Sequence, residues 1–379
     1  MRPEPFTIAI PDADLDDLRR RLEATRWADD FGNADWTYGV ERGWLEKMVG
    51  YWASEFDWRA QEAAMNALAQ FRVELDGMLV HFIHVRAKTK EPIPLLLTHG
   101  WPWTFWDYKD MIQPLMEAGF DVVVPSIPGS AFSPLRKTGV VIPGIAERWV
   151  ALMRDVLGYN HFAAAGGDWG ASITAELGHA HAQHLLGVYL TTPTWPGLNL
   201  SQVDPTQFAA DEQWMLERLA QVGGLGLGSA TIQRIGTQTL AYALVDSPVG
   251  TASWLWERRR AWSEAGSDPL TVFDRDFLCT TASIYWLTRT IGTSIRLYRD
   301  HYTHGWKPRD EGSPIVKAPT GIAVYPKDVV FVPRSLAERA TNLVRWTVMP
   351  RGGHYGPSEQ PAAAVGELTT FFHALRDAA

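Results

Sequence analysis

Hydrophobic positions in the middle of the chain alternate between short continuous runs and runs with helical spacing. The short runs, which are typical of buried strands, are Pro94–Thr98, Asp121–Val124, Phe162–Ala165 and Leu186–Leu190. Helical periodicity lies between them at Phe105–Ala118, Ile145–Leu157 and Ala171–Leu177. Strands that alternate with helices in this way predict an α/β fold with a mostly parallel sheet and helices on both faces.

The same alternation returns near the C-terminus after a long interruption. Strands are expected at Gly321–Tyr325 and Leu343–Val348, and helices at Ser335–Ala340 and Ala362–Leu375. From Trp195 to about Pro314 the sequence is instead helical and aromatic, with few strand signals. An excursion of this kind within a βα series predicts an inserted helical lid.

The N-terminal segment has a third pattern. Asp12 is expected to cap a helix that presents Leu15, Leu18 and Leu22 on one face. Trp-rich, turn-rich sequence follows, and then the alternating segments Phe71–Asp76 and Leu79–Val85, separated by Gly77-Met78, predict a β-hairpin. We therefore expect a meander that wraps the core. The chain divides into residues 1–90 (meander and first hairpin strands), 91–194 (first part of the core), 195–314 (lid) and 315–379 (second part of the core).

Composition narrows the class of function. The 379 residues carry a formal net charge of −8, which disfavours nucleic acid and anionic membranes as partners. The one basic run, Arg258-Arg259-Arg260, is predicted to be the solvated face of a helix. Cys279 is the single cysteine, so no internal disulfide is expected, and neither a signal peptide nor a membrane span is apparent. These features predict a soluble, cytoplasmic protein, and they leave a homodimer open.

Candidate chemistry lies where the predicted strands end. Gly166-Gly167-Asp168-Trp169-Gly170 follows a strand and precedes a helix, and its glycines allow a sharp turn that lifts Asp168 above the sheet edge. A plain alternative is that Asp168 only caps the helix. Asp328 and His354 each follow a later strand, which gives the order nucleophile, acid, histidine found in α/β-hydrolases. The sequence thus predicts an α/β-hydrolase core with Asp168 as nucleophile.

The loop His99-Gly100-Trp101-Pro102 follows the Pro94–Thr98 strand. In this fold class that loop supplies one backbone N–H of an oxyanion hole, and the residue after the nucleophile, here Trp169, supplies the other. We expect His99 itself to be a buried structural residue with no role in proton transfer.

An aspartate at the turn determines which reactions are possible. A carboxylate is ionised near neutral pH and needs no base to attack. It can displace a leaving group from saturated carbon to form an alkyl ester, which water activated by His354 then hydrolyses while Asp328 holds the imidazole. No metal or cofactor is needed. Epoxides and alkyl halides both fit this scheme.

The chain resembles the microsomal-type epoxide hydrolase family over nearly its whole length. The motifs that carry the resemblance are Phe56-Asp57-Trp58-Arg59, His99-Gly100-Trp101-Pro102, Pro125-Ser126-Ile127-Pro128-Gly129, Gly166-Gly167-Asp168-Trp169-Gly170, Asp246-Ser247-Pro248-Val249-Gly250 and Arg351-Gly352-Gly353-His354. The resemblance implies Asp168 as nucleophile, Asp328 as acid, His354 as base and the Trp101 and Trp169 amides as oxyanion hole. The substrate would be a small-molecule epoxide, and the 18 tryptophans of the chain favour one of apolar or aromatic character.

The resemblance also implies lid tyrosines that protonate the epoxide oxygen. Tyr298 matches one of them, whereas the second falls on or near Ser229, with no tyrosine between Tyr189 and Tyr242. The candidates to replace it are Tyr242, Tyr285 and Tyr302.

A further departure from the family is Trp103, which stands where a glycine is usual after His-Gly-Trp-Pro. Trp103 and Pro102 are predicted to contact the substrate and to narrow the pocket. Two rival functions stay open, a haloalkane dehalogenase that uses the same aspartate and a non-catalytic binding protein on this scaffold.

Overall fold

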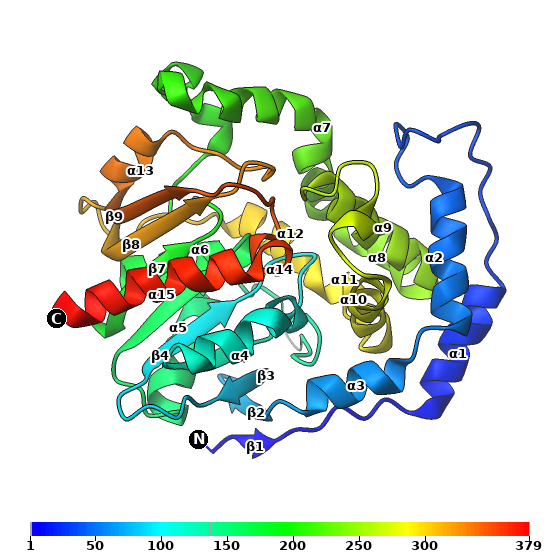
Figure 1. Ribbon diagram of the computed structural model, residues 1–379, viewed down its shortest axis with the longest axis horizontal. Helices are drawn as coiled ribbons and strands as arrows, with labels where there is room; N and C mark the ends of the chain where they lie inside the picture. The colour runs from blue at the N-terminus through cyan, green and yellow to red at the C-terminus, as the bar shows by residue number, and fades with distance from the viewer. Residues whose placement is uncertain (1, 136–137, 379) are drawn as a thin grey trace.

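A mostly parallel β-sheet forms the centre of the molecule (Figure 1). The computed structural model describes residues 2–135 and 138–378. Within them the sheet has nine strands in the order β1-β2-β3-β5-β4-β6-β7-β8-β9. The pairs β1–β2, β2–β3 and β3–β5 are antiparallel, and the other neighbouring strands are parallel. The strands are β1 (Glu4–Pro5), β2 (Gln70–Leu75), β3 (Met78–Val85), β4 (Ile93–Thr98), β5 (Phe120–Pro125), β6 (Phe162–Gly166), β7 (Leu185–Leu190), β8 (Val316–Val324) and β9 (Thr341–Val348).

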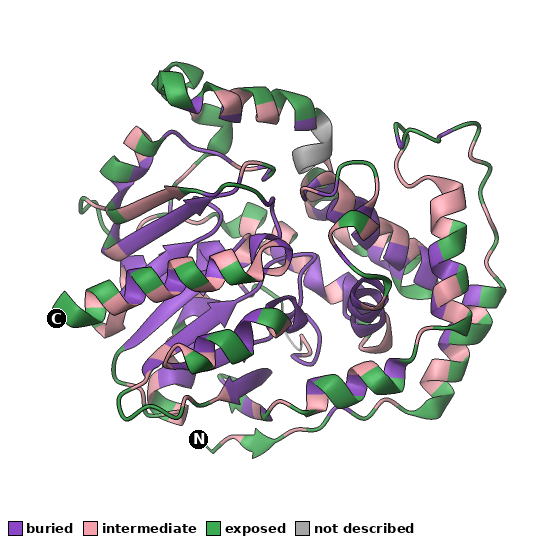
Figure 2. Cartoon of the chain, in the orientation of Figure 1, coloured by how far each residue is buried: buried purple, intermediate pink, exposed green. Residues whose placement is uncertain are grey.

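Helices cover both faces of the sheet, as the sequence predicts. α4 (Lys109–Glu117) and α15 (Pro361–Ala378) pack together on one face, and α5 (Ile142–Ala151) and α6 (Trp169–Ala180) pack together on the other (Figure 1). Figure 2 shows the central strands buried between these layers, which explains their continuous apolar sequences. The shorter elements of this part are η1 (Phe105–Tyr108), η2 (Leu152–Val156), η3 (Ala182–His184), α13 (Arg334–Ala340) and α14 (Gly356–Glu359).

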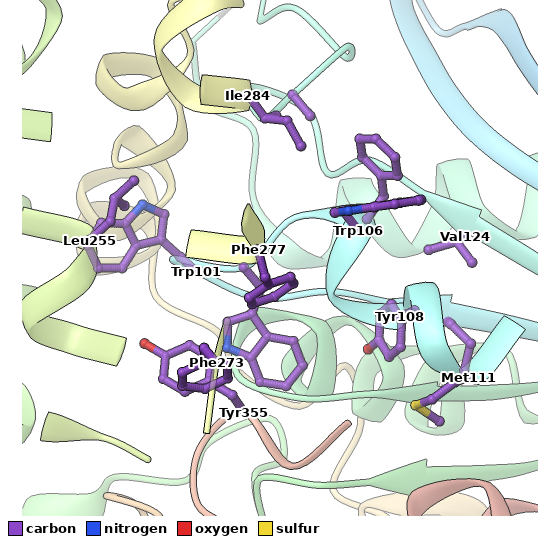
Figure 3. Close-up of a cluster of buried hydrophobic side chains, with 14 of the residues drawn as sticks. Trp101, Trp106, Tyr108, Met111, Val124, Leu255, Phe273, Phe277, Ile284 and Tyr355 are labelled. Atoms are coloured by element: carbon purple, nitrogen blue, oxygen red, sulfur yellow. The ribbon is translucent and has the colours of Figure 1, made fainter. Parts of the chain in front are cut away.

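Between β7 and β8 the chain leaves the sheet and folds into helices. Its main elements are α7 (Gln213–Ile235), α8 (Thr237–Asp246), α9 (Pro248–Ala261), α10 (Arg275–Leu287), α11 (Ile291–Ser294) and α12 (Arg296–His304). Short 3-10 turns are η4 (Leu200–Gln202), η5 (Pro205–Gln207), η6 (Ala210–Glu212) and η7 (Pro269–Thr271). One buried cluster joins this lid to the core, because Leu255 and Phe277 of the lid belong to it together with Trp106 and Tyr108 (Figure 3).

The N-terminal helices pack against the lid. α1 (Asp12–Glu23), α2 (Arg42–Ser54) and α3 (Trp58–Asn66) run along the lid side of the molecule (Figure 1). The indole N–H of Trp44 donates to Asp268 at 3.0 Å and that of Trp52 to Ser283 at 2.9 Å. These helices therefore pack on the lid, while β1 of the same segment pairs with β2 at the edge of the sheet.

Most predicted elements are confirmed, with ends shifted by a few residues. The hairpin turn is Asp76-Gly77, where both φ angles are positive, at 47° and 69°. Pro11 and not Asp12 occupies the N-cap position of α1, so the predicted cap was wrong. α2 and α3 were missed, since the sequence analysis treated this stretch as Trp-rich and turn-rich. No helix in the described part of the chain is long and apolar enough to cross a membrane.

Candidate active site

Asp168 stands on the sharp turn between β6 and α6. Its backbone has φ 52° and ψ −125°, a strained conformation for a non-glycine residue. Two features hold the turn: the Asp168 amide donates to Thr192 Oγ1 at 3.1 Å, and α6 approaches β4 so closely that a Cβ on Gly170 would lie 1.9 Å from the Thr98 carbonyl oxygen. The glycines of the motif therefore permit the contact that lifts the carboxylate above the sheet edge.

The loop after β4 contacts the Asp168 carboxylate directly. The Trp101 amide donates to Asp168 Oδ1 at 2.7 Å, and a Cβ on Gly100 would lie only 2.4 Å from Asp168 Cβ. The Asp168 side chain accepts no such bond from the first turn of α6, where Trp169 is the first residue. The structure thus places one of the two predicted oxyanion donors, Trp101, on a carboxylate oxygen, and leaves the Trp169 amide beside the carboxylate without that bond.

His354 joins the two aspartates. Its Nδ1 lies 2.8 Å from Asp328 Oδ1, and its Nε2 lies 3.4 Å from Asp168 Oδ2. His354 and Asp328 are almost completely buried, at 3% and 1% exposure, whereas the Asp168 side chain is 20% exposed. Three residues that are far apart in the sequence are therefore brought into one line, and the aspartate that reaches solvent is the one on the strained turn.

The charges around His354 decide its protonation. Burial alone would lower its pKa, but the negative charge of Asp328 and the contacts with Asp168 outweigh burial and raise the pKa to about 10. His354 in the free protein is therefore an imidazolium held between two carboxylates at neutral pH.

The lid holds the loop that carries His354. The His354 amide donates to the Trp262 carbonyl at 2.7 Å, and the two rings meet edge to face with centroids 5.1 Å apart. Arg218 of α7 donates to the Lys327 and Asp328 carbonyls at 2.8 and 3.3 Å. The sequence analysis missed Trp262 and Arg218, because both act across about a hundred residues or more of chain and belong to no local motif.

A cavity of about 550 Å³ opens onto Asp168. Its walls come from the core and from lid helices α7 and α12, and they include Trp169, Tyr298 and Trp306. The Tyr298 ring packs edge to face on Trp169 and Trp101, with centroids 4.9 and 5.8 Å apart. Burial raises the pKa of the Tyr298 phenol well above its usual value, so this side chain keeps its proton and remains a donor.

The other candidate tyrosines differ in position. Tyr285 is buried and its hydroxyl donates to the Trp103 carbonyl at 2.8 Å, while Tyr242 is 72% exposed and lies outside the cavity wall. Tyr302 lines the cavity one helical turn beyond Tyr298. Ser229, where the second family tyrosine falls, is buried, and its hydroxyl makes no hydrogen bond within the described residues.

Trp103 and Pro102, predicted to bind substrate, do not line this cavity. Trp103 is fully buried beneath the strained turn, where its ring would lie 2.6 Å from a Cβ on Gly167, and its ring also packs on His354 and Tyr355. The Pro102 carbonyl faces the Arg259 guanidinium at 3.5 Å. The bulk of Trp103 thus supports the catalytic loops from below and leaves the cavity free.

The basic run of the lid is also not a solvated face. Arg258 and Arg259 are buried, at 6% and 1% exposure. Arg259 Nη1 lies 2.7 Å from the fully buried Asp107 Oδ1, and its guanidinium stacks on the Tyr355 ring at 4.0 Å. The prediction failed because the acid that pairs with Arg259 lies in η1, more than a hundred residues away.

His99 lies where it was expected, in the core. It is fully buried, its Nδ1 is 2.8 Å from the Gly100 carbonyl oxygen and its Nε2 accepts the Ile127 amide at 3.1 Å. Burial lowers its pKa. Within the described residues, no three or more His, Cys, Asp or Glu side chains gather as a metal site would require.

Comparisons with known proteins agree with this geometry. The model of the epoxide hydrolase N terminus matches residues 3–108, and that of the alpha/beta hydrolase fold matches residues 93–234. A putative epoxide hydrolase of Stigmatella aurantiaca is 36% identical over 98% of this chain and 85% of its own length. Epoxide hydrolase 1 of Oryctolagus cuniculus is 28% identical over 97% of this chain and 88% of its own length.

Solved structures give the same picture. The epoxide hydrolase of Aspergillus niger superposes with a TM-score of 0.87 at 28% identity, and the match covers 99% of this chain and 97% of that one. The juvenile hormone epoxide hydrolase of Bombyx mori reaches a TM-score of 0.88 at 22% identity over 99% and 95% of the two chains, which shows the shared fold.

Proposed function

This chain belongs to the epoxide hydrolases, and from that premise we propose that it converts an epoxide to a vicinal diol through a covalent ester on Asp168. The observation that carries the mechanism is the alignment of Asp168, His354 and Asp328, with His354 3.4 Å from one and 2.8 Å from the other. A carboxylate attacks without the help of a base, so a histidine beside Asp168 is needed only to hydrolyse the ester that forms on Asp168.

In the first step Asp168 Oδ2 attacks an epoxide carbon. Oδ1 is already bonded to the Trp101 amide, so Oδ2 is the oxygen free to act. The carbon–oxygen bond of the ring breaks, its electron pair stays on the oxygen, and the Tyr298 phenol gives that oxygen a proton. The product is a hydroxyalkyl ester of Asp168 with the Tyr298 phenolate beside it.

In the second step water attacks the ester carbon of Asp168. Esterification removes the negative charge of Asp168, which is one cause of the raised pKa of His354. His354 then gives up its proton, which returns the Tyr298 phenolate to the phenol by way of water. Nε2 is now the base that takes a proton from the attacking water. The Trp101 amide stabilises the oxyanion on Oδ1, and collapse of this intermediate releases the diol and restores the carboxylate.

The segment 195–314 would act as the lid of this site, and the aromatic side chains Trp169, Tyr298 and Trp306 on the cavity wall suit an apolar or aromatic epoxide. A cytoplasmic location and a homodimer are the working expectations for the protein.

Replacing the base should trap the intermediate. In His354→Gln, ring opening by Asp168 remains but water is no longer activated, so the intact-protein mass should rise by the mass of one added epoxide. The double variant Asp168→Ala/His354→Gln is the control and should gain nothing. An unchanged mass in His354→Gln, with slow diol formation persisting, would contradict covalent catalysis.

One observation supports a second substrate class. The Trp169 side chain lies on the cavity wall next to Asp168 and interacts with the Tyr298 phenol, and its indole N–H is the kind of donor that binds a leaving halide. Halide release from a haloalkane, without diol formation from styrene oxide, would favour the dehalogenase. Loss of epoxide turnover in Asp168→Ala would exclude a non-catalytic binding protein.

A further inference from the structure

The lid places one arginine on the cavity wall without an acidic partner. Arg234 of α7 lines the cavity, and no described carboxylate lies within ion-pair distance of it. Its guanidinium carbon is 4.7 Å from the Tyr302 ring centroid, and its Nε is buried without a hydrogen-bond partner. The Arg234 side chain thus packs against an aromatic ring, and among the described residues its charge has no ion-pair partner and its Nε has no hydrogen-bond acceptor.

The surroundings of Arg234 are also cationic. Asp168 is the one acidic side chain among the described residues of the cavity wall. The Arg299 guanidinium lies close by, because its Nη1 donates to the Arg234 carbonyl at 3.4 Å. Arg234 and Arg299 therefore put positive charge at one part of the cavity, on a chain whose net charge is −8. Positive charge there favours an anionic group of a ligand.

Arg234 lies away from the reacting end of the cavity. Tyr298 and Tyr302 are four residues apart on α12, which corresponds to about 6 Å along the helix axis. Tyr298 packs on Trp101 and Trp169 near Asp168, whereas Tyr302 is 57% exposed. Apolar walls that include Leu198 and Trp306 belong to the same cavity. One cavity thus offers a ligand the carboxylate of Asp168, apolar side chains and the guanidinium of Arg234.

We propose that Arg234 binds the carboxylate of the substrate, so that the preferred substrates are amphipathic epoxy acids with an apolar chain between the oxirane and the carboxylate. This inference rests on the proposed epoxide hydrolysis and names its substrate class. A single planar guanidinium matches a carboxylate with two parallel hydrogen bonds, and stacking on Tyr302 orients it in advance.

The test compares terminal epoxy acids of increasing chain length with their methyl esters. At low ionic strength the acid of the best-fitting length should exceed its ester in kcat/KM by about fivefold or more, mainly through KM, and added salt should reduce this ratio. Arg234→Gln should bring the ratio of acid to ester close to one, and Arg234→Lys should keep part of it.

Arg296→Gln is the matched control. Arg296 loses the same charge in the same region of the lid, but its guanidinium bonds to Gln238 and it does not line the cavity. The preference for acids should survive this change. Equal turnover of acid and ester by the unaltered protein, or a preference that survives Arg234→Gln, would overturn the inference while leaving epoxide hydrolysis intact.

A binding measurement separates this inference from the proposed function. If no epoxide is hydrolysed, calorimetric titration with decanoate and decan-1-ol still tests the site. Tighter binding of decanoate that Arg234→Gln abolishes would support the anion site, and equal binding of the two ligands would exclude it.

Discussion

At the scale of single residues, Asp168, His354 and Tyr298 each have a different set of neighbours. Asp168 is held by the Trp101 amide on one oxygen and faces His354 with the other. His354 is buried between two carboxylates, whereas the Tyr298 phenol is surrounded by indole rings. The proposed nucleophile, base and proton donor are therefore distinguished by their neighbours, which set the protonation of His354 and Tyr298.

Tyr298→Phe should slow ring opening. In the proposed mechanism the phenol donates the proton that the epoxide oxygen needs, so its removal should reduce the rate of ester formation by about 10-fold or more. Rapid mixing with an epoxide, followed by tryptophan fluorescence, measures that step alone. Tyr242→Phe, at an exposed position outside the cavity wall, is the matched control. An unaffected rate in Tyr298→Phe would show that another group protonates the oxygen.

The pH dependence of ester hydrolysis should report on His354. In the free protein its pKa is raised to about 10, and the negative charge of Asp168 contributes to this shift. Esterification removes that charge, so in the intermediate His354 should lose its proton at a lower pH. The rate of ester decay in single turnovers should rise with pH through an inflection below 10. An inflection at or above that value would show that Asp168 does not control the base.

At the scale of elements, buried contacts from the lid fix the catalytic loops. Arg259 of α9 pairs with Asp107 of η1, stacks on Tyr355 beside the base and faces the Pro102 carbonyl. Arg259 therefore contacts both the loop that carries His354 and the loop that carries Trp101. Figure 3 shows Tyr355 and Phe273 within the buried cluster to which Trp101 also belongs.

Arg259→Met should destabilise the protein strongly. The change leaves Asp107 buried and charged without its partner, which costs about 3–5 kcal/mol in the free energy of unfolding. Adding Asp107→Asn should recover part of the loss, because the amide still accepts from the Thr104 backbone. Urea unfolding measures both variants. The exposed pair of Arg42 and Glu46 is the control, and Arg42→Gln should cost less than about 1 kcal/mol. A loss in Arg259→Met no larger than in this control would contradict the role of the pair.

Local sequence patterns were enough to predict the strands and the turn that carry the site. The side-chain contacts between distant segments could not be predicted from the sequence. Apolar runs and glycine spacing were enough for β4, β6 and the strained turn at Asp168, because these depend on neighbouring residues. The burial of Arg259 depends on Asp107, and the support of His354 depends on Trp262. The spacing of residues along the chain does not reveal such contacts, so Arg259 was predicted to face solvent. The packing of Trp103 on His354 and Tyr355 is also long-range, and Trp103 was predicted to line the cavity.

At the scale of the whole molecule, the core and the lid form one structure around the site. Asp168, Asp328 and His354 come from the carboxyl edge of the sheet, and Tyr298 and Arg234 come from the lid. The N-terminal helices bind the far side of the lid through Trp44 and Trp52. All three parts of the chain therefore contribute to the surroundings of the site, either directly or through contacts with the lid.

The most direct test of the account follows oxygen from solvent into Asp168. During many turnovers in heavy-oxygen water, water attacks the ester carbon, so the Asp168 carboxylate should acquire the label. Mass spectrometry of the peptide that contains Asp168 would detect it, and His354→Gln should prevent it. Labelled diol together with an unlabelled Asp168 would mean that water opens the epoxide directly, which contradicts the covalent mechanism.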